Sequence, residues 1–255
     1  IGFEASLLQN KIGIKFDWYQ KKTQDLLYNP ELPGTAGAAA APYVNIAAMT
    51  NTGLDMEFSF REKWGDFGFD GSLIMTTYKN NIDKIAEGVT FFDAGNQTNT
   101  ANRINGVPSR NEVGHPMSSF FGYKVIGLFQ TAAEVSESPK QTGAEPGFFK
   151  FQDTNGDGTI SPADRLYIGD PNPKFTYGIN LAFTYKSWDV TGFMYGSSGN
   201  DIFNWNKWWI DFWPSFQGQK STDILNNSWT PERTGASVPK ASNKSNFSTN
   251  TEIND

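Results

Sequence analysis

The chain has 255 residues, of which 38% are hydrophobic and 15% aromatic, and it carries a formal net charge of −6 at pH 7. Its mean hydropathy of −0.49 and the lack of a long apolar run exclude membrane-spanning helices but stay compatible with half-apolar barrel strands. The acidic balance disfavours nucleic acid as a partner. Because cysteine is absent and His115 is the one histidine, disulfides, thiolate sites, histidine-based triads and multi-histidine metal sites are excluded within this chain.

Apolar and polar residues alternate in three segments, 11–18, 55–61 and 179–186. Successive side chains of a strand point to opposite faces, so each segment predicts a strand with one apolar wall and one polar wall. The chain begins within a predicted strand and stops in a polar run. We therefore expect an internal segment of a longer protein.

Short joins alternate with long connections along the chain. Short joins are predicted at residues 9–10, 62–65 and 185–188. The long, polar, glycine-rich and proline-rich connections are 20–50, 79–118, 127–172 and 197–255. Outer-membrane barrels are built in this way, with short periplasmic turns and long extracellular loops.

Aromatic residues at the predicted strand ends favour a barrel, because aromatic girdles mark the two interfaces of a barrel with the membrane. These residues are Trp18, Tyr19, Trp64, Tyr78, Tyr185 and Trp188. A soluble β-sandwich shows the same alternation, however, with its apolar wall facing a partner sheet.

Two stretches carry more specific information than the alternation does. Residues 153–185 read DTNGDGTISPADRLYIGDPNPKFTYGINLAFTY, an acidic glycine-rich loop followed by a predicted strand, and residues 43–61 contain NIAAMTNTGLDMEFSFR. The first stretch resembles a signature segment of the SusC/RagA group of TonB-dependent outer-membrane transporters, and the second is similar to the turn before another strand of that family. The resemblance covers most of residues 1–205.

This resemblance implies an all-β fold in which residues 1–255 form part of an antiparallel transmembrane β-barrel with long extracellular loops, without the N-terminal plug domain. It implies localisation in the outer membrane of a Bacteroidetes-like bacterium, contact with membrane lipid, and import of an oligosaccharide or peptide. It also implies a SusD-like surface lipoprotein as partner, and energy supplied by TonB through an N-terminal part missing from this chain.

The segment 153–164 also fits an oxygen-ligand loop of the EF-hand type on its residues alone. Hard oxygens recur at alternate positions, and Gly158 stands at position 6, where such a loop turns sharply. The candidate ligands are Asp153, Asn155, Asp157, Thr159 through its carbonyl, Ser161 through water, and Asp164 at position 12.

The expected cation is Ca²⁺, with Mg²⁺ as a rival because Asp164 is shorter than the usual Glu. Ile160 at position 8 is expected to anchor the loop to neighbouring structure. The alternative is an Asx-rich turn that satisfies its own backbone and binds nothing.

The segment 197–255 is predicted to be a long loop, first rich in tryptophan and then polar. Its candidate ligand-binding residues are Trp205, Trp208, Trp209 and Trp213, whose rings are suited to stacking on a sugar or burying against a partner protein. Their spacing also fits one face of a short helix that packs on its own loop.

No catalytic constellation is present in the sequence. Carboxylates such as Asp66, Asp70 and Glu112 have no spacing that singles out an acid/base pair, and phosphate-binding, dinucleotide and nucleophile-elbow motifs are absent. We therefore predict a nutrient importer rather than an enzyme. The alternative is a soluble, extracellular, calcium-stabilised β-sandwich that binds carbohydrate.

Overall fold

A computed structural model describes residues 1–28, 43–94, 109–212 and 218–242. The chain divides into two compact units. The first comprises Ile1–Phe92, Asn111–Met117 and Asp170–Asp201, and the second comprises the segments that alternate with these. Among the described residues, no helix has the length and apolar character needed to cross a membrane.

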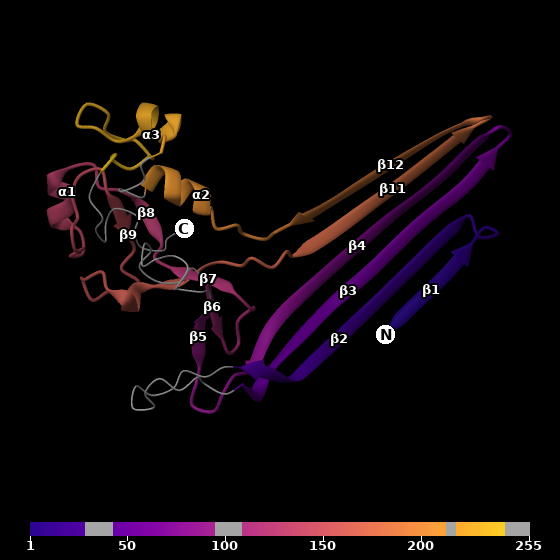
Figure 1. Ribbon diagram of the computed structural model, residues 1–255, viewed down its shortest axis with the longest axis horizontal. Coiled ribbons are helices and arrows are strands. Elements are labelled where there is room, and N and C mark those ends of the chain that lie inside the picture. The colour runs from indigo at the N-terminus through magenta and orange to yellow at the C-terminus, as the bar shows by residue number, and fades with distance from the viewer. Residues whose placement is uncertain (29–42, 95–108, 213–217, 243–255) are drawn as a thin grey trace. The chain divides into compact units, whose positions relative to one another are not determined.

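The first unit is built on a six-stranded sheet of order β1-β2-β3-β4-β11-β12, in which every neighbouring pair is antiparallel (Figure 1). Its strands are β1 (Gly2–Leu7), β2 (Ile12–Tyr28), β3 (Val44–Trp64), β4 (Phe67–Lys84), β11 (Phe175–Tyr185) and β12 (Trp188–Ser198). The spatial order of the strands in this sheet is the same as their order in the chain. The segment between β4 and β11 contains the short strands of the other sheets. Among the described residues, β1 and β12 are the two end strands of this sheet.

Period-two alternation sets the register of this sheet. Ile14 lies opposite Phe58, Phe58 lies opposite Leu73, and Leu73 lies opposite Ile179. One row of apolar side chains therefore crosses four strands on the same face. A slip of one residue in any pair would move that strand's apolar side chains to the other face, which is why the pattern specifies the register.

Two of the three tight turns are shorter than the sequence predicted, whereas the turn predicted at residues 9–10 is longer and comprises residues 8–11. β3 continues to Trp64 and β4 begins at Phe67, so the turn predicted at residues 62–65 is centred on Gly65 and Asp66. Gly65 has φ of +60°, a left-handed conformation that glycine adopts without steric cost. The join at 185–188 likewise narrows to residues 186–187.

The predicted loops 20–50 and 79–118 are wrong at their borders, because β2, β3 and β4 run for 17, 21 and 18 residues. Parts of these strands, Gln20–Asp25, Thr50–Thr52 and Lys79–Asn81, are polar on both faces, so no alternation marks them as strands. Side-chain hydrogen bonds join them instead: Thr50 Oγ1 donates to Asp83 Oδ2 at 2.5 Å, and Asn80 Nδ2 donates to Asn51 Oδ1 at 2.6 Å.

The second unit contains short elements and a core of its own. Strands β7, β8, β9 and β10 lie wholly within it, and β8 pairs with β9 in a two-stranded sheet. Strands β7 and β10 belong to a four-stranded sheet of order β10-β7-β6-β5, in which the residues of β5 and β6 are divided between the two units. The strand bounds are β5 (Phe91–Ala94), β6 (Ser109–Glu112), β7 (Ser119–Gly122), β8 (Val125–Leu128), β9 (Phe149–Phe151) and β10 (Leu166–Gly169). The helical elements are α1 (Ala132–Glu137), η2 (Pro162–Asp164), α2 (Trp205–Lys207), the π-helical η3 (Trp208–Phe212) and α3 (Thr222–Asn227).

The connections 127–172 and 197–255, predicted as loops, thus fold where the structure describes them. Tyr123, Phe151 and Trp229 are 2%, 1% and 6% exposed and share one buried cluster. Trp229 lies far from the other two in sequence, so no local pattern indicates that these segments pack together. Buried aromatic area of this size stabilises a unit that short elements alone do not support.

Candidate functional site

The six-stranded sheet has one continuous apolar face. Registered pairing places the alternating apolar residues of all six strands on it. Its large members are Phe3, Leu7, Ile12, Ile14, Phe16, Trp18, Leu54, Met56, Phe58, Phe60, Trp64, Phe67, Phe69, Leu73, Met75, Phe175, Tyr177, Ile179, Leu181, Phe183, Tyr185, Trp188, Val190 and Met194. Many remain exposed, including Phe58 at 47%, Val190 at 61% and Met194 at 57%. An apolar surface this extensive requires an apolar environment.

The apolar band has the height of a membrane. β11 and β12 have 11 residues each. A tilted strand needs about 9–11 residues to cross the hydrocarbon core of a membrane, so both strands are long enough. Beyond Trp18 on β2, the same face continues with Gln20 and Lys22, so the band ends there. The wall therefore has a lipid-matched portion and a polar extension.

Aromatic residues border this band at the edge where the tight turns lie. Trp64 and Phe67 stack with ring centroids 5.8 Å apart, and Tyr185 and Trp188 flank the neighbouring turn. Trp18 lies on the apolar face toward the opposite edge. Tyr19 and Tyr78 were predicted as strand-end aromatics of the same kind, but both lie on the polar face.

Tyr19 and Tyr78 both lie opposite Gly53. A Cβ atom at Gly53 would meet the Tyr19 hydroxyl at 2.6 Å and the Thr77 carbonyl at 2.4 Å, so a glycine is required between the two rings.

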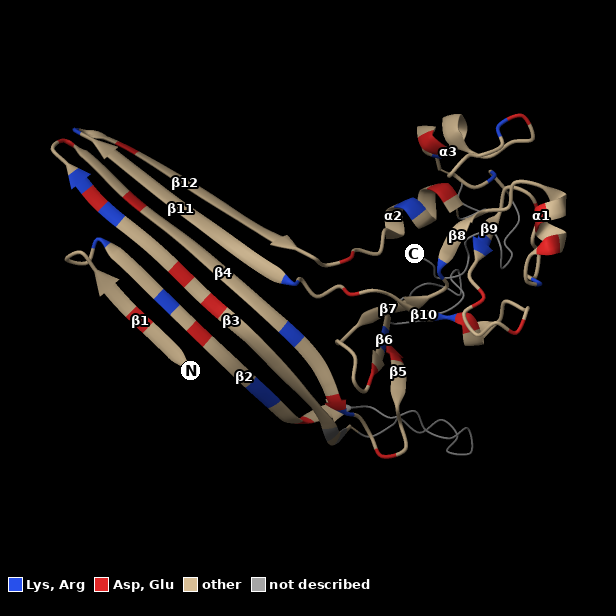
Figure 2. Ribbon diagram, turned by 180° about the vertical axis from the view of Figure 1, so that it is seen from behind, with Lys and Arg blue, Asp and Glu red and all other residues tan. Residues whose placement is uncertain are grey.

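The opposite face is polar and carries paired charges on β2, β3 and β4 (Figure 2). Lys15 Nζ lies 3.4 Å from Glu57 Oε2, and Arg61 Nε donates to Asp70 Oδ2 at 2.5 Å. β11 has no charged residue and β12 has one, Asp189. In a closed barrel with the apolar face toward lipid, this face lines the interior.

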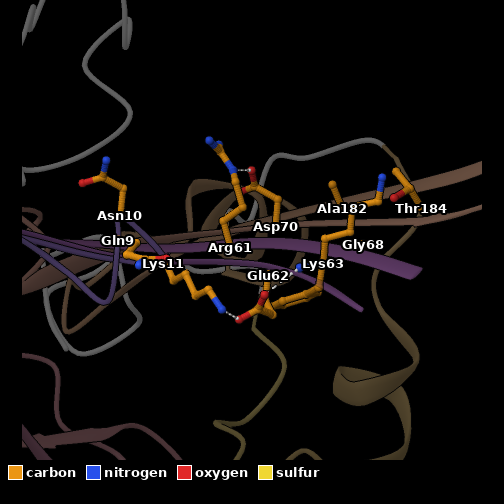
Figure 3. Close-up of a pocket in the computed structure, with 11 residues that line it drawn as sticks. Gln9, Asn10, Lys11, Arg61, Glu62, Lys63, Gly68, Asp70, Ala182 and Thr184 are labelled. Atoms are coloured by element: carbon orange, nitrogen blue, oxygen red, sulfur yellow. Dashed lines mark hydrogen bonds and ion pairs between the residues drawn. The ribbon is translucent and has the colours of Figure 1, made fainter. Parts of the chain in front are cut away.

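A pocket of about 480 Å³ opens at the edge of the sheet where the tight turns lie (Figure 3). Its lining residues are Gln9, Asn10, Lys11, Arg61, Glu62, Lys63, Gly68, Phe69, Asp70, Ala182 and Thr184. Arg61 points toward Asp70, and Lys11 points toward Glu62, with which it forms an ion pair. Because both carboxylates already have a cationic partner, the pocket does not present the unpaired acid and base of a hydrolytic site.

The acidic loop 153–164 closes on itself through its carboxylates. Asp153 Oδ1 and Oδ2 accept from the backbone N–H groups of Gly156 and Gly158 at 2.8 and 2.9 Å. Asn155 Oδ1 accepts from the N–H of Asp157 at 2.9 Å, and Asp157 Oδ1 accepts from the N–H of Thr159 at 2.8 Å. Gly156 and Gly158 have φ of +73° and +79°, the left-handed conformation that lets the backbone wrap inward.

Asp164 is buried, with 0% of its side chain exposed. Its Oδ1 accepts from the N–H of Thr154 at 3.0 Å, and its Oδ2 accepts from the N–H of Ser161 at 2.7 Å. Burial acts to raise the pKa of Asp164, but the N–H donors of Ser161, Thr154 and Asn155 together hold the pKa below its ordinary value. The charged carboxylate therefore fastens the two ends of the loop together.

The anchoring role expected of Ile160 is confirmed. Its side chain is 6% exposed and belongs to the buried cluster of Tyr123 and Trp229. Lys140 donates its N–H to the carbonyl of Gly158, and its own carbonyl accepts from the N–H of Ile160, at 2.8 and 2.9 Å. The loop thus extends from the core of the second unit.

The exposed side-chain oxygens of the loop are better placed to bind a cation than the buried carboxylate of Asp164. Among the described residues, no three side chains of His, Cys, Asp or Glu converge tightly enough to hold a metal ion. The oxygens of Asp153, Asn155 and Asp157 are on the exposed side of the loop, whereas those of Asp164 are buried under N–H donors. A cation here would draw on the exposed oxygens and on the carbonyl of Thr159, with Ser161 occupied in capping η2.

The tryptophan segment is a short helix packed on its own unit. Trp208 is 5% exposed and packs with Ile168, Phe203 and Trp209. Trp205 is 38% exposed and meets Trp208 edge-on, with centroids 5.9 Å apart. Trp213 lies outside the described residues. Of the predicted ligand-binding rings, Trp205 is accessible and Trp208 is buried.

Comparison with known proteins connects this wall to one group. Residues 1–112 match the family described as TonB dependent receptor-like, beta-barrel. TonB-dependent receptor P3 of Formosa agariphila is 29% identical over 242 residues, which cover 94% of this chain and 23% of that protein. TonB-dependent receptor SusC of Bacteroides thetaiotaomicron is 26% identical over 208 residues, which cover 79% of this chain and 19% of that protein.

Solved structures give the same result for the fold. The structure of the RagAB peptide transporter has a TM-score of 0.74 at 19% identity, covering 98% of this chain and 26% of that chain. The chain is similar to a part of a SusC/RagA-like TonB-dependent receptor barrel. It spans about a quarter of the length of the RagAB transporter chain and of the P3 receptor.

The family match and the fold of the solved neighbours confirm the predicted partial outer-membrane β-barrel, and this fold replaces the soluble-sandwich alternative. The matched relatives are receptors, which agrees with the prediction that the chain is not an enzyme.

Proposed function

We propose that the whole protein containing this chain imports a nutrient, an oligosaccharide or a peptide, across the outer membrane. The observation that carries the proposal is the two-faced sheet. An apolar face of membrane height and a polar face with paired charges suit a wall between lipid and a hydrophilic passage. The SusC-like relatives and the RagAB peptide transporter support import as the activity.

The proposal extends to two partners. A SusD-like surface lipoprotein is the expected extracellular partner, and TonB is the expected energy source, acting through a part of the protein outside this chain. The names of the relatives support both assignments. The folded second unit supports the assignment of a lipoprotein partner, since a unit with its own core offers a defined surface to a partner.

Import is tested in cells that carry or lack the complete receptor. Uptake of labelled neutral oligosaccharides and of labelled peptides into the periplasm is measured in both strains, with and without a protonophore. We expect uptake of one class to require both the receptor and the proton-motive force, while surface binding persists without that force. Equal uptake in the two strains would contradict the proposal.

We also propose that the loop 153–164 binds Ca²⁺, with Mg²⁺ as the rival, and that the ion stiffens the second unit. The alternation of oxygen side chains and the left-handed Gly156 and Gly158 support it. The oxygens of Asp153, Asn155 and Asp157 are the ligands expected to take part. Their present hydrogen bonds to backbone N–H groups leave lone pairs for an ion, because each carboxylate has about four acceptor sites and the amide oxygen of Asn155 has two.

A further inference from the structure

Two exposed aromatic rings interrupt the polar face of the barrel wall. Phe193 and Tyr195 on β12 lie opposite Asn180 and Gly178 of β11. This places them on the polar face, because the alternate residues Val190 and Met194 belong to the apolar one. Their side chains are 65% and 79% exposed. Exposed large aromatic residues on a face that carries mostly polar side chains require an explanation beyond the strand pattern.

The two rings form one unit. Their centroids are 5.8 Å apart and their planes differ by 21°. Gly178 opposite Tyr195 has no side chain, and a Cβ there would come 3.9 Å from the Phe193 ring. Ile74 lies across from Gly178 on β4 and is 43% exposed, so the apolar patch extends over three strands.

The surroundings of the rings are polar but uncharged. Asn180 Nδ2 donates to Ser72 Oγ at 3.1 Å beside Phe193. The other positions around the pair on this face are Thr76, Thr176, Thr191 and Ser197. The charged residues of this part of the sheet lie on β2–β4, at Asp189 near the turn before β12, and at Lys174 at the start of β11 (Figure 2). The nearest of them on β4, Asp70, already pairs with Arg61.

We propose that Phe193 and Tyr195 form a stacking site for a neutral carbohydrate on the interior face of the barrel. A sugar ring has apolar C–H faces and a rim of hydroxyl groups, so it needs aromatic surface beside neutral hydrogen-bonding groups. That is the chemistry of this patch. Consecutive rings of an oligosaccharide are separated by a distance similar to that between the two aromatic centroids. A peptide would bring charged termini and side chains, whereas the described positions that directly neighbour the two rings on this face are uncharged.

This inference rests on the proposed import function and names a substrate class for it. The test uses the complete receptor purified in detergent, with isothermal titration of a set of neutral hexose oligosaccharides, an oligogalacturonate and a pool of tripeptides. The variant Phe193→Thr/Tyr195→Thr keeps strand-forming residues of the type found on this face. Tyr177→Leu, on the apolar face of β11, is the matched control for loss of an aromatic ring.

We expect the double variant to bind the neutral oligosaccharide about tenfold or more weakly, from two lost ring contacts, and the control to bind as the wild type does. Unchanged affinity in the double variant would overturn the site. Binding of tripeptides but of no neutral oligosaccharide would overturn the carbohydrate assignment and leave import standing. A variant barrel that unfolds at lower temperature but binds with wild-type affinity would show that the rings pack on another segment.

Failure of import is distinguishable from these results. If the purified receptor binds oligosaccharide through the rings but cells lacking it take up the sugar normally, the site stands and the import proposal fails.

Discussion

Phe69 and Phe183 lie side by side on the apolar face, with ring centroids 5.0 Å apart across β4 and β11. More than a hundred residues separate them in sequence, and the whole segment between β4 and β11 leaves the wall and returns. The contact joins the two sections of the sheet, which makes it a sensitive point for assembly of the wall.

We expect Phe69→Leu and Phe183→Leu to be coupled in the complete receptor. Each removes ring contact at the junction of β4 and β11, and aromatic pairs contribute about 0.5–1.5 kcal/mol beyond area burial. A double-mutant cycle on urea unfolding in detergent measures this coupling. Additive effects of the two substitutions would show that the rings do not interact in the folded barrel.

An introduced charge should destabilise the barrel much more on one face of β4 than on the other. Leu73 lies in the middle of the apolar face, so Leu73→Arg is expected to destabilise the barrel by about 2–4 kcal/mol. Its sequence neighbour Ser72 lies on the polar face, and Ser72→Arg should cost much less. The fraction of folded barrel in each variant is measured by the heat-dependent shift of its band in electrophoresis of the outer-membrane fraction. Equal loss of folded barrel in both would contradict the assignment of faces.

Calcium content provides the test of the acidic loop. Asp157→Ala removes one exposed oxygen ligand and should abolish Ca²⁺ bound to the purified receptor, and it should also loosen residues 153–164 toward protease. Glu137→Ala on α1 removes a charge from the same unit and serves as the control. Metal analysis by mass spectrometry gives the readout. Unchanged calcium in Asp157→Ala would leave the self-satisfied Asx turn as the correct interpretation.

Acid should release the loop through Asp164. Its folded-state pKa is lowered, so its carboxylate contributes stability above its ordinary pKa of about 3.9, and that contribution is lost as pH falls through the lower folded value. At pH 7, Asp164→Asn should weaken the loop by about 1–3 kcal/mol, because buried N–H donors lose a charged acceptor.

Hydrogen exchange of the amides of Thr154 and Ser161 measures this effect. The difference between wild type and variant should shrink as pH is lowered below about 4. A difference that persists undiminished at the lowest pH would contradict the role of the carboxylate charge.

The effect of replacing a tryptophan in the segment 205–209 should depend on how deeply its ring is buried. Trp208→Ala removes a ring that is 5% exposed and should destabilise the packing around η3 by about 3–5 kcal/mol. Trp205→Ala, at 38% exposure, should cost less. Limited proteolysis near Lys207 follows the effect. If both variants keep the protection of the wild type and lose oligosaccharide binding, the rings serve a ligand rather than the fold.

The sequence by itself determined the strands and their faces. Alternation at Ile12–Trp18, at Met56–Phe60 and at Ile179–Tyr185 specifies which side chains share the apolar face, because a strand has only two faces. The segment 153–185 carried the resemblance to the SusC/RagA group. Glycine and Asx residues in 153–164 predicted a tight oxygen-lined loop, and the loop is present.

The tertiary structure decided what local patterns do not encode. The packing of Trp229 with Tyr123 and Phe151 depends on contacts between distant segments, so the connections predicted as loops were in fact folded. The burial of Asp164 beneath N–H donors depends on the closure of the whole loop. From the sequence alone, this carboxylate was predicted to be a metal ligand because its hydrogen-bond donors were not known. The rings of Phe193 and Tyr195 became conspicuous only when cross-strand register placed them on the polar face, because that register is a long-range property of the sheet.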